Sequence, residues 1–314
     1  MTSVHPELAP VLDRLPDRPE NPYADMPALR AEFRALMAPR TAGTDERVTV
    51  ESTTIPGPDG NRIDAHLVRP RGATGTLPAI VYIHGGGFAY GELDGPSPMV
   101  RDACAAAGAV VISPHYRLAP EHRFPAGLED CYAVVTWVHA HAAELGIDPA
   151  RIAVGGASAG ACLSAAVCLL SRDRTGPAIA FQCLCIPVLD DRGDSESRRT
   201  MRDRRVINGP GIVDTWDTYL GPDRDPALTS PYAAPARAAD LSDLPPAYIL
   251  TCGLDPVRDD GLDYAIALAR ADVPVQLRHV AGAWHLFEAY APDSRLARAT
   301  TADWLGALRD ALVA

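Results

Sequence analysis

The chain alternates short apolar runs with longer stretches of helical periodicity, and no other feature of the sequence restricts the fold as strongly. Short runs rich in valine and isoleucine are typical of buried strands in a parallel sheet. Apolar residues spaced three and four apart indicate helices that cover the faces of such a sheet. We therefore expect an α/β protein with a mostly parallel, eight-stranded sheet and helices on both faces.

The individual elements can be assigned from these patterns. The clearest helical periodicity covers residues 127–143 and 296–313. Residues 56–60 read Pro-Gly-Pro-Asp-Gly, which is typical of a hairpin turn between the first two strands. The strands are expected at residues 48–54, 62–68, 79–83, 109–113, 152–155, 179–186, 247–252 and 275–280.

Two regions interrupt the alternation. Residues 1–45 precede the first strand, and residues 190–230 are dense in arginine, aspartate, proline and glycine. We interpret both as parts of a helical cap, which leaves residues 46–189 and 231–314 as the two parts of the α/β core. The charged run from Arg198 to Arg205 is expected to be a solvated helix face, with an anion site as the alternative.

The bulk properties narrow the choice of partners. A formal net charge of -11 leaves no basic surface for a nucleic acid or an anionic membrane, so a small neutral substrate fits better. No apolar run reaches the length of about 20 residues that a membrane helix needs, and the N-terminus lacks the pattern of a signal peptide. These features predict a cytoplasmic protein without a membrane span.

Cysteine and lysine usage excludes further classes of chemistry. The seven cysteines are spaced like neither a disulfide framework nor a zinc site, so we expect them to be reduced and mostly buried. The chain contains no lysine, which excludes Schiff-base catalysis on a lysine side chain.

The strongest local signal is the pentapeptide Gly-Ala-Ser-Ala-Gly at residues 156–160, between a predicted strand and a run compatible with a helix. A nucleophile elbow forces its serine into a strained turn, so the residues two before and two after it must be nearly free of side chain. Gly156 and Gly160 meet this requirement around Ser158. The pentapeptide also occurs in ordinary strand-to-helix turns, so it requires support from elsewhere in the chain.

A second signal is the run His84-Gly85-Gly86-Gly87-Phe88, directly after a predicted strand. Consecutive glycines leave backbone N–H groups accessible to a ligand oxygen, as stabilisation of an oxyanion requires. The rival interpretation is the phosphate loop of a nucleotide or dinucleotide enzyme, but neither G-x-G-x-x-G nor a Walker lysine is present. We therefore expect an oxyanion hole, with His84 in a structural role.

An acid and a base follow in the chain order that this arrangement requires. Asp255 comes after the seventh predicted strand and His285 after the eighth, so both leave the carboxyl ends of strands, where open α/β sheets place their sites. Asp259 and Asp260 fall where a helix N-terminus favours carboxylates. His279 lies within a strand and lacks the reach of a loop residue. Asp255 and His285 are therefore the preferred pair.

With these residues placed, the chain resembles the bacterial esterases related to hormone-sensitive lipase, a branch of the α/β hydrolases with an N-terminal cap. The resemblance covers most of the chain. It depends on six motifs in family order, at residues 84–88, 116–121 (Tyr-Arg-Leu-Ala-Pro-Glu), 156–160, 230–232 (Ser-Pro-Tyr), 255–259 (Asp-Pro-Val-Arg-Asp) and 285–287 (His-Leu-Phe).

The resemblance implies a serine carboxylesterase that cleaves short-chain acyl esters through an acyl-enzyme. It implies no metal and no cofactor, and it allows a homodimer. The residues it implies are the triad Ser158, Asp255 and His285, the oxyanion N–H groups of Gly85, Gly86 and Ala159, and structural support from His84, Gly87, Gly156 and Gly160.

Three positions depart from the family pattern. Ala157 stands where the family has aspartate, Ala161 where a further glycine is common, and His115 where aspartate often precedes the Tyr-Arg pair. None of these removes a triad member. Trp284 and Leu286 either line the acyl pocket or pack in the core. The same triad acting on amides or lactones, or a non-catalytic ligand receptor on this fold, stay open as alternatives.

Overall fold

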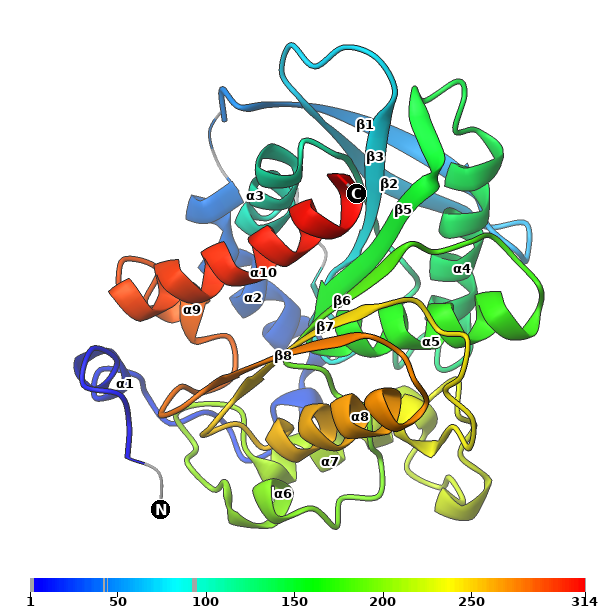
Figure 1. Cartoon of the computed structure of the whole chain (residues 1–314). Coiled ribbons are helices and arrows are strands. Elements are labelled where there is room, and N and C mark those ends of the chain that lie inside the picture. The colour runs from blue at the N-terminus through cyan, green and yellow to red at the C-terminus, as the bar shows by residue number, and fades with distance from the viewer. Residues whose placement is uncertain (1–2, 42, 44, 92–94, 314) are drawn as a thin grey trace.

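The computed structural model describes residues 3–41, 43, 45–91 and 95–313 (Figure 1). Parts of the predicted segments, namely residues 1–2, 42 and 44 of the cap and 92–94 and 314 of the core, lie outside the described residues. The strands are β1 (Val48–Pro56), β2 (Arg62–Pro70), β3 (Leu77–Ile83), β4 (Val110–Pro114), β5 (Ile147–Ala157), β6 (Phe181–Cys185), β7 (Ala247–Cys252) and β8 (Val275–Val280).

All of these strands belong to one sheet with the order β1-β2-β4-β3-β5-β6-β7-β8. β2 pairs antiparallel with both β1 and β4, and every other neighbouring pair is parallel. The predicted mostly parallel, eight-stranded sheet is confirmed. The predicted hairpin is also confirmed, because Pro56 at the end of β1 pairs with Arg62 at the start of β2.

Helices cover both faces of the sheet. The α-helices are α1 (Ala9–Leu12), α2 (Met26–Thr41), α3 (Pro98–Ala107), α4 (Ala126–Ala140), α5 (Ala159–Asp173), α6 (Glu196–Thr200), α7 (Gly209–Leu220), α8 (Arg258–Arg270), α9 (Phe287–Tyr290) and α10 (Arg295–Val313), with short 3-10 turns η1 (Pro22–Ala24), η2 (Pro226–Leu228) and η3 (Pro235–Arg237). None of the described helices combines the length and the apolarity that crossing a membrane requires.

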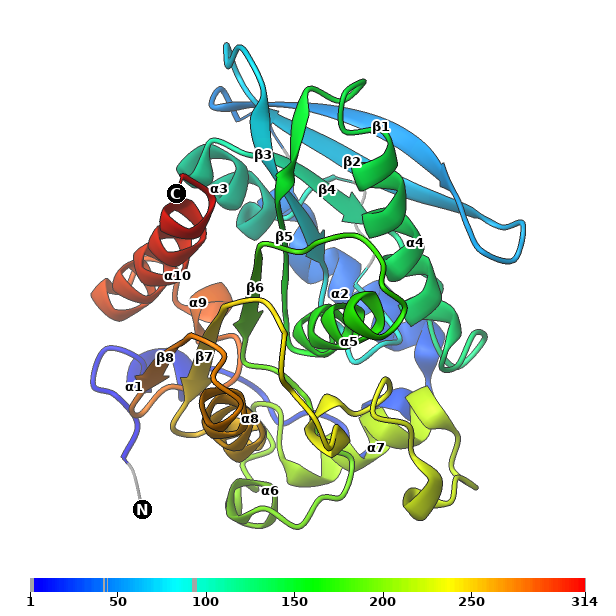
Figure 2. The ribbon, with the colours of Figure 1, turned by 45° about the vertical axis from the view of Figure 1, so that its right-hand side comes forward.

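Each face of the sheet has its own hydrophobic core. α3 and α10 lie on one face, whereas α4, α5 and α8 lie on the other (Figure 2). Successive residues of β3 alternate between the two cores, so that Ile80 and Tyr82 join the first and Val81 and Ile83 the second. This double burial explains why the central strands read as continuous apolar runs rather than as alternating ones.

Strand ends are where expectation and structure differ most. β7 and β8 have the predicted bounds, but β5 begins earlier than predicted because Ile147 already pairs with Leu77 of β3. β6 begins at Phe181, later than predicted, and it ends at Cys185 because Ile186 has a φ of 46° and leaves the extended conformation. All seven cysteines are free and buried, as expected.

The two predicted cap regions contact each other. In the N-terminal region, the backbone N–H of Arg18 donates to the carbonyl of Arg204 at 2.9 Å. The hydroxyls of Tyr23 and Thr215 form a hydrogen bond of 2.7 Å between η1 and α7. α6 and α7 lie together beside α8 in both ribbon views (Figures 1 and 2).

The expectation of a solvated helix face from Arg198 to Arg205 is wrong at Arg198. The side chain of Arg198 is only 3% exposed, and it forms an ion pair with Asp260, which is 1% exposed. α6 packs against both α7 and α8, so the helix face that carries Arg198 is turned toward the protein. Arg199 and Arg202 of the same run are exposed, as expected.

Candidate active site

Four loops meet at the carboxyl edge of the parallel strands. They follow β3, β5, β7 and β8, which belong to the contiguous parallel part of the sheet. Carboxyl ends of parallel strands share one edge, so the glycine run and the three predicted catalytic residues gather there.

Ser158 has the backbone conformation of a nucleophile elbow. It lies between β5 and α5 with φ 59° and ψ -122°, a region that costs a non-glycine residue on the order of 1–3 kcal/mol. Its N–H donates to the carbonyl of Cys185 on β6 at 2.9 Å, which helps to hold the turn. The side chain is buried except for a 5% exposed fraction.

Gly156 and Gly160 are required by close packing around the elbow. A Cβ at Gly160 would lie 2.0 Å from the carbonyl oxygen of Ile83, and one at Gly156 would lie 2.3 Å from the same oxygen. The two glycines also face each other, because that Cβ of Gly156 would lie 2.7 Å from the carbonyl carbon of Gly160. Strand and helix can therefore converge on Ser158 only where both positions lack a side chain.

His285 lies between Ser158 and Asp255. Its Nε2 is 2.9 Å from Ser158 Oγ, and its Nδ1 is 2.7 Å from Asp255 Oδ2. The side chains of His285 and Asp255 are fully buried. Asp255 Oδ1 accepts a hydrogen bond from the N–H of Val257 at 3.0 Å, so both carboxylate oxygens have a partner. The structure thus brings together the three side chains that the sequence singled out.

The glycine run lies directly against the elbow. A Cβ at Gly85 would be 2.7 Å from the carbonyl oxygen of Ala157 and 3.4 Å from Ser158 Cβ. Gly86 has a φ of 118°, which favours glycine. Within the described part of the chain, the N–H groups of Gly85, Gly86 and Ala159 donate no hydrogen bond. Three donors beside the serine are therefore available to a ligand oxygen.

His84 is half-buried at the start of the glycine run. Its Nδ1 lies 2.7 Å from the Gly85 carbonyl, and its ring stacks on Tyr116 with a centroid separation of 4.4 Å. Burial lowers the pKa of His84 to about 4, so the ring is neutral near pH 7 and donates from Nδ1 to that carbonyl. These contacts favour the predicted structural role.

Aromatic residues that sequence reasoning missed close over the glycine run. A Cβ at Gly87 would lie 2.1 Å from the hydroxyl of Tyr23, and one at Gly86 would lie 3.1 Å from the ring of Tyr90. Tyr90 in turn packs against Phe33 of α2, with ring centroids 5.1 Å apart. Tyr23 and Phe33 belong to the N-terminal region that interrupts the alternation of strands and helices, so that alternation did not reveal these contacts.

The residues beside His285 differ in their surroundings. Trp284 is buried in the hydrophobic core, which favours core packing over a place in the acyl pocket, whereas Leu286 is partly buried. Burial raises the pKa of Glu288 to about 7, although the nearby His285 lowers it.

No group of three or more histidine, cysteine, aspartate or glutamate side chains is arranged to hold a metal ion within residues 3–41, 43, 45–91 and 95–313.

Comparison with known proteins agrees with this geometry. A family model described as alpha/beta hydrolase fold matches residues 80–289. The carboxylesterase NlhH of Mycobacterium tuberculosis is 37% identical over 99% of this chain and 98% of its own. The carboxylic ester hydrolase LipN of the same organism is 40% identical over 84% of this chain and 70% of its own. The solved structure of a bacterial heroin esterase has a TM-score of 0.94 and 39% identity, covering 99% of this chain and 98% of that one.

The chain therefore belongs to the α/β-hydrolase family. Within that family it is a carboxylic ester hydrolase of the group related to hormone-sensitive lipase, as the relatives at 37–40% identity over most of the chain are.

Proposed function

We propose that this enzyme hydrolyses short-chain carboxylic esters through an acyl-enzyme on Ser158, with His285 as general base and Asp255 as its carboxylate partner. The observation that carries the proposal is the continuous hydrogen-bond chain from Ser158 Oγ through His285 to Asp255 at 2.9 and 2.7 Å. This is the arrangement that activates a serine hydroxyl for acyl transfer.

The reaction would proceed in two halves. His285 Nε2 takes the proton from Ser158 Oγ as the oxygen attacks the ester carbonyl, and the resulting imidazolium passes that proton to the leaving alcohol. Water activated by the same imidazole then attacks the acyl-enzyme, and the carboxylic acid and the free serine are formed. Asp255 holds the Nδ1–H tautomer that both halves require.

The oxyanion that forms in each half would be bound by the N–H groups of Gly85, Gly86 and Ala159. Their lack of another acceptor among the described residues supports this assignment. Preorganised donors of this kind contribute about 3–4 kcal/mol each to transition-state stabilisation in serine hydrolases.

The cap would consist of residues 1–45 and 190–230 and would limit the acyl group. Three contacts between described residues of the two regions, Arg18 with Arg204, Tyr23 with Thr215 and Arg205 with Asp13, support one cap from both. The rings of Tyr23 and Tyr90 against the glycine run favour a small acyl group. The free thiols of all seven cysteines support a reducing compartment such as the cytoplasm.

The test is a panel of p-nitrophenyl esters of graded acyl length, together with amide and lactone analogues. We expect the highest kcat/KM on short acyl esters and complete inactivation by a serine-directed organophosphate. Ser158→Ala should lower kcat by about 10⁴-fold or more while the protein stays folded.

A matched control is Ser171→Ala, because the hydroxyl of this buried serine near the end of α5 donates to the carbonyl of Pro177. It should retain the activity of the unmodified enzyme. Turnover that survives the organophosphate, or a Ser158→Ala variant with most of its activity, would contradict acyl-enzyme formation on Ser158.

A further inference from the structure

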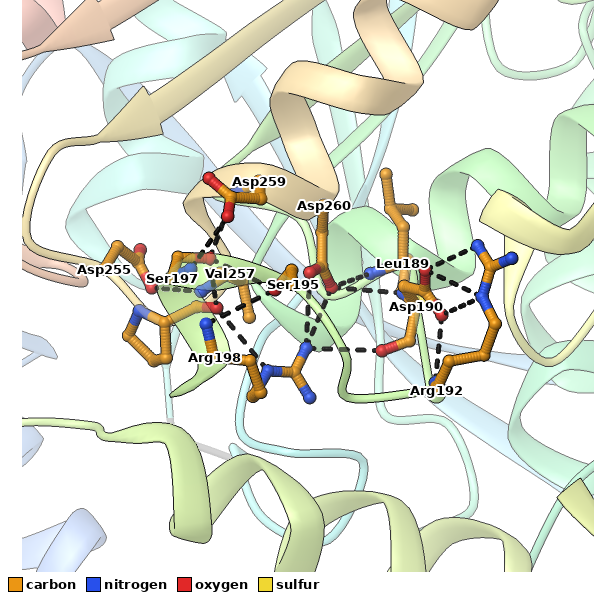
Figure 3. A network of polar contacts seen from close by, with 12 residues as sticks. Leu189, Asp190, Arg192, Ser195, Ser197, Arg198, Asp255, Val257, Asp259 and Asp260 are labelled. Carbon is orange, nitrogen blue, oxygen red and sulfur yellow. Dashed lines mark hydrogen bonds and ion pairs between the residues drawn. The ribbon is translucent and has the colours of Figure 1, made fainter. Parts of the chain in front are cut away.

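The peptide that follows Asp255 is tied to α6 of the 190–230 segment. The carbonyl oxygen of Pro256 accepts a hydrogen bond from Ser197 Oγ at 2.9 Å and one from Arg198 Nε at 3.5 Å. Figure 3 shows these contacts beside the hydrogen bond between Asp255 and Val257. Two neighbouring residues of the insertion therefore hold a carbonyl group one residue away from the catalytic acid.

Ser197 makes a second connection at the start of α8. Its N–H donates to Asp259 Oδ2 at 2.7 Å, and its Oγ accepts from the N–H of Asp259 at 3.3 Å. Ser197 thus contacts the loop at Pro256 and at Asp259. A rotation of the peptide between these two residues would break one contact or the other.

Arg198 connects the same helix to Asp260. Arg198 Nη2 lies 3.1 Å from Asp260 Oδ2 and also donates to the carbonyl of Asp190 at 3.2 Å. Asp260 Oδ2 accepts the N–H groups of Leu189 and Asp190, each at 3.1 Å. The end of the first core segment, α6 and the first turn of α8 are therefore joined at one carboxylate.

The burial of this ion pair requires an explanation other than stability. Moving both charges out of water costs about as much as their attraction returns, so apolar residues of the same size would serve stability equally well. Burial raises the pKa of Asp260 to about 7 even though Arg198 and two N–H groups lower it. A directional network, in contrast with apolar packing, restricts the orientation of the loop.

We propose that Ser197 and Arg198 are positioning residues, which hold the Pro256 carbonyl and the start of α8 so that Asp255 keeps Oδ2 toward His285. Neither residue contacts the reacting atoms. The inference rests on the proposed function, because these residues act through Asp255. It also makes the insertion a part of the machinery that orients the acid.

The first test is Arg198→Met, which retains an unbranched apolar stem and removes the hydrogen bonds. We expect kcat to fall by roughly tenfold to a hundredfold while KM changes by less than about twofold, because sub-ångström misplacement of a catalytic group costs rate rather than binding. The far-downfield proton NMR signal of the hydrogen bond between His285 Nδ1 and Asp255 should move upfield or broaden. If Arg198 contributed only to stability, the chemical shift of that proton would be the same in Arg198→Met and in the wild-type enzyme.

A second test variant and two controls separate positioning from stability. Ser197→Ala removes only the hydroxyl that contacts Pro256 and the N–H of Asp259, and it should lower kcat by about threefold to tenfold. Thr200→Ala on the same helix removes a hydroxyl that bonds to Glu196 within α6, and it should leave kcat and the NMR signal unchanged. Arg172→Met breaks hydrogen bonds to the carbonyls of Asp240 and Ser242, so it should lower stability without moving the signal.

The proposal is overturned if Arg198→Met and Ser197→Ala keep the wild-type kcat per folded molecule and the wild-type NMR signal. The proposal is also overturned if the losses of kcat in these two variants match the loss of kcat in Arg172→Met. Should Arg198→Met not fold, Ser197→Ala alone decides the outcome. An inactive wild-type enzyme would contradict the proposed function, whereas the NMR comparison would still test the positioning of Asp255.

Discussion

The carbonyl oxygen of Ile83 at the end of β3 lies against the α-carbon of Gly160 in α5, at a distance that leaves no room for a side chain. This contact brings the glycine run that follows Ile83 next to Ser158. We predict that Gly160→Ala lowers the free energy of unfolding by about 2–4 kcal/mol and abolishes most ester hydrolysis, because strand and helix must separate. Denaturant unfolding and kcat/KM would measure both effects.

The matched control is Gly306→Ala in α10. A Cβ at Gly306 meets nothing within 4 Å outside its own helix, so the substitution should stabilise the protein by about 0.5–1 kcal/mol through helix propensity. Activity should be unchanged. If Gly160→Ala and Gly306→Ala have the same free energy of unfolding and the same kcat/KM, the contact between Ile83 and Gly160 does not restrict the elbow.

Replacement of Asp255 should show its effect on His285 separately from any effect on folding. Asp255→Asn keeps the size of the side chain, but an amide does not stabilise the Nδ1–H tautomer or the imidazolium of His285. We expect kcat to fall by about 10³–10⁴-fold, with the folded structure retained by circular dichroism. A variant within tenfold of the wild-type kcat would rule out Asp255 as the partner of the base.

The hydrogen bond between Tyr23 and Thr215 should hold the two parts of the cap together. Tyr23→Phe removes the 2.7 Å contact, so we expect a loss of about 1 kcal/mol in unfolding free energy and a raised KM for small esters. Tyr248→Phe is the control, because it removes a 2.7 Å hydrogen bond to Asp303 between β7 and α10. Its stability should fall similarly with no change in KM, and a KM shift in both variants would speak against a cap-specific effect.

Glu288 should make the stability of the protein depend on pH. Its pKa is raised to about 7 in the folded state, above the ordinary value of 4.5, so the folded state binds more protons than the unfolded state between these values. The contribution of Glu288 to stability is therefore present below about pH 4.5 and is lost as the pH rises toward 7. Glu288→Gln should be more stable than wild type at pH 8 by about 1–2 kcal/mol and nearly equal at pH 4.

The measurement is urea unfolding of both proteins across this pH range. Glu144→Gln is a control, because it removes the same charge from an exposed side chain. Its stability curve should run parallel to that of wild type. A Glu288→Gln curve that is also parallel to wild type would contradict the burial argument.

Local patterns predicted the elements of the site because each follows from short-range sterics. Glycines two residues from Ser158 are needed wherever a strand turns sharply into a helix, and this requirement is readable in five residues. The chain order of Asp255 and His285 followed from strands whose bounds were predicted correctly. Their hydrogen-bonded arrangement in the structure agrees with the predicted triad, whose catalytic role stays a prediction.

Periodicity was a poor guide where burial depends on distant partners. Arg198 belongs to a charged run that favours a solvated face, yet it is buried because Asp260, far along the chain, accepts its guanidinium. Tyr23 lies in a segment without a pattern, and its position over Gly87 follows from a contact with a residue 192 positions away.

The amino-acid sequence by itself determined the α/β class, the parallel sheet, the elbow around Ser158 and the choice of an acid and a base, since these depend on local propensity, spacing and strand order. Only the tertiary structure decided how the two cap regions meet, which aromatic rings cover the glycine run and that the Asp255 loop is tied to α6. Those features depend on side chains that are distant in sequence, and their contacts form only when the layers of the fold pack together.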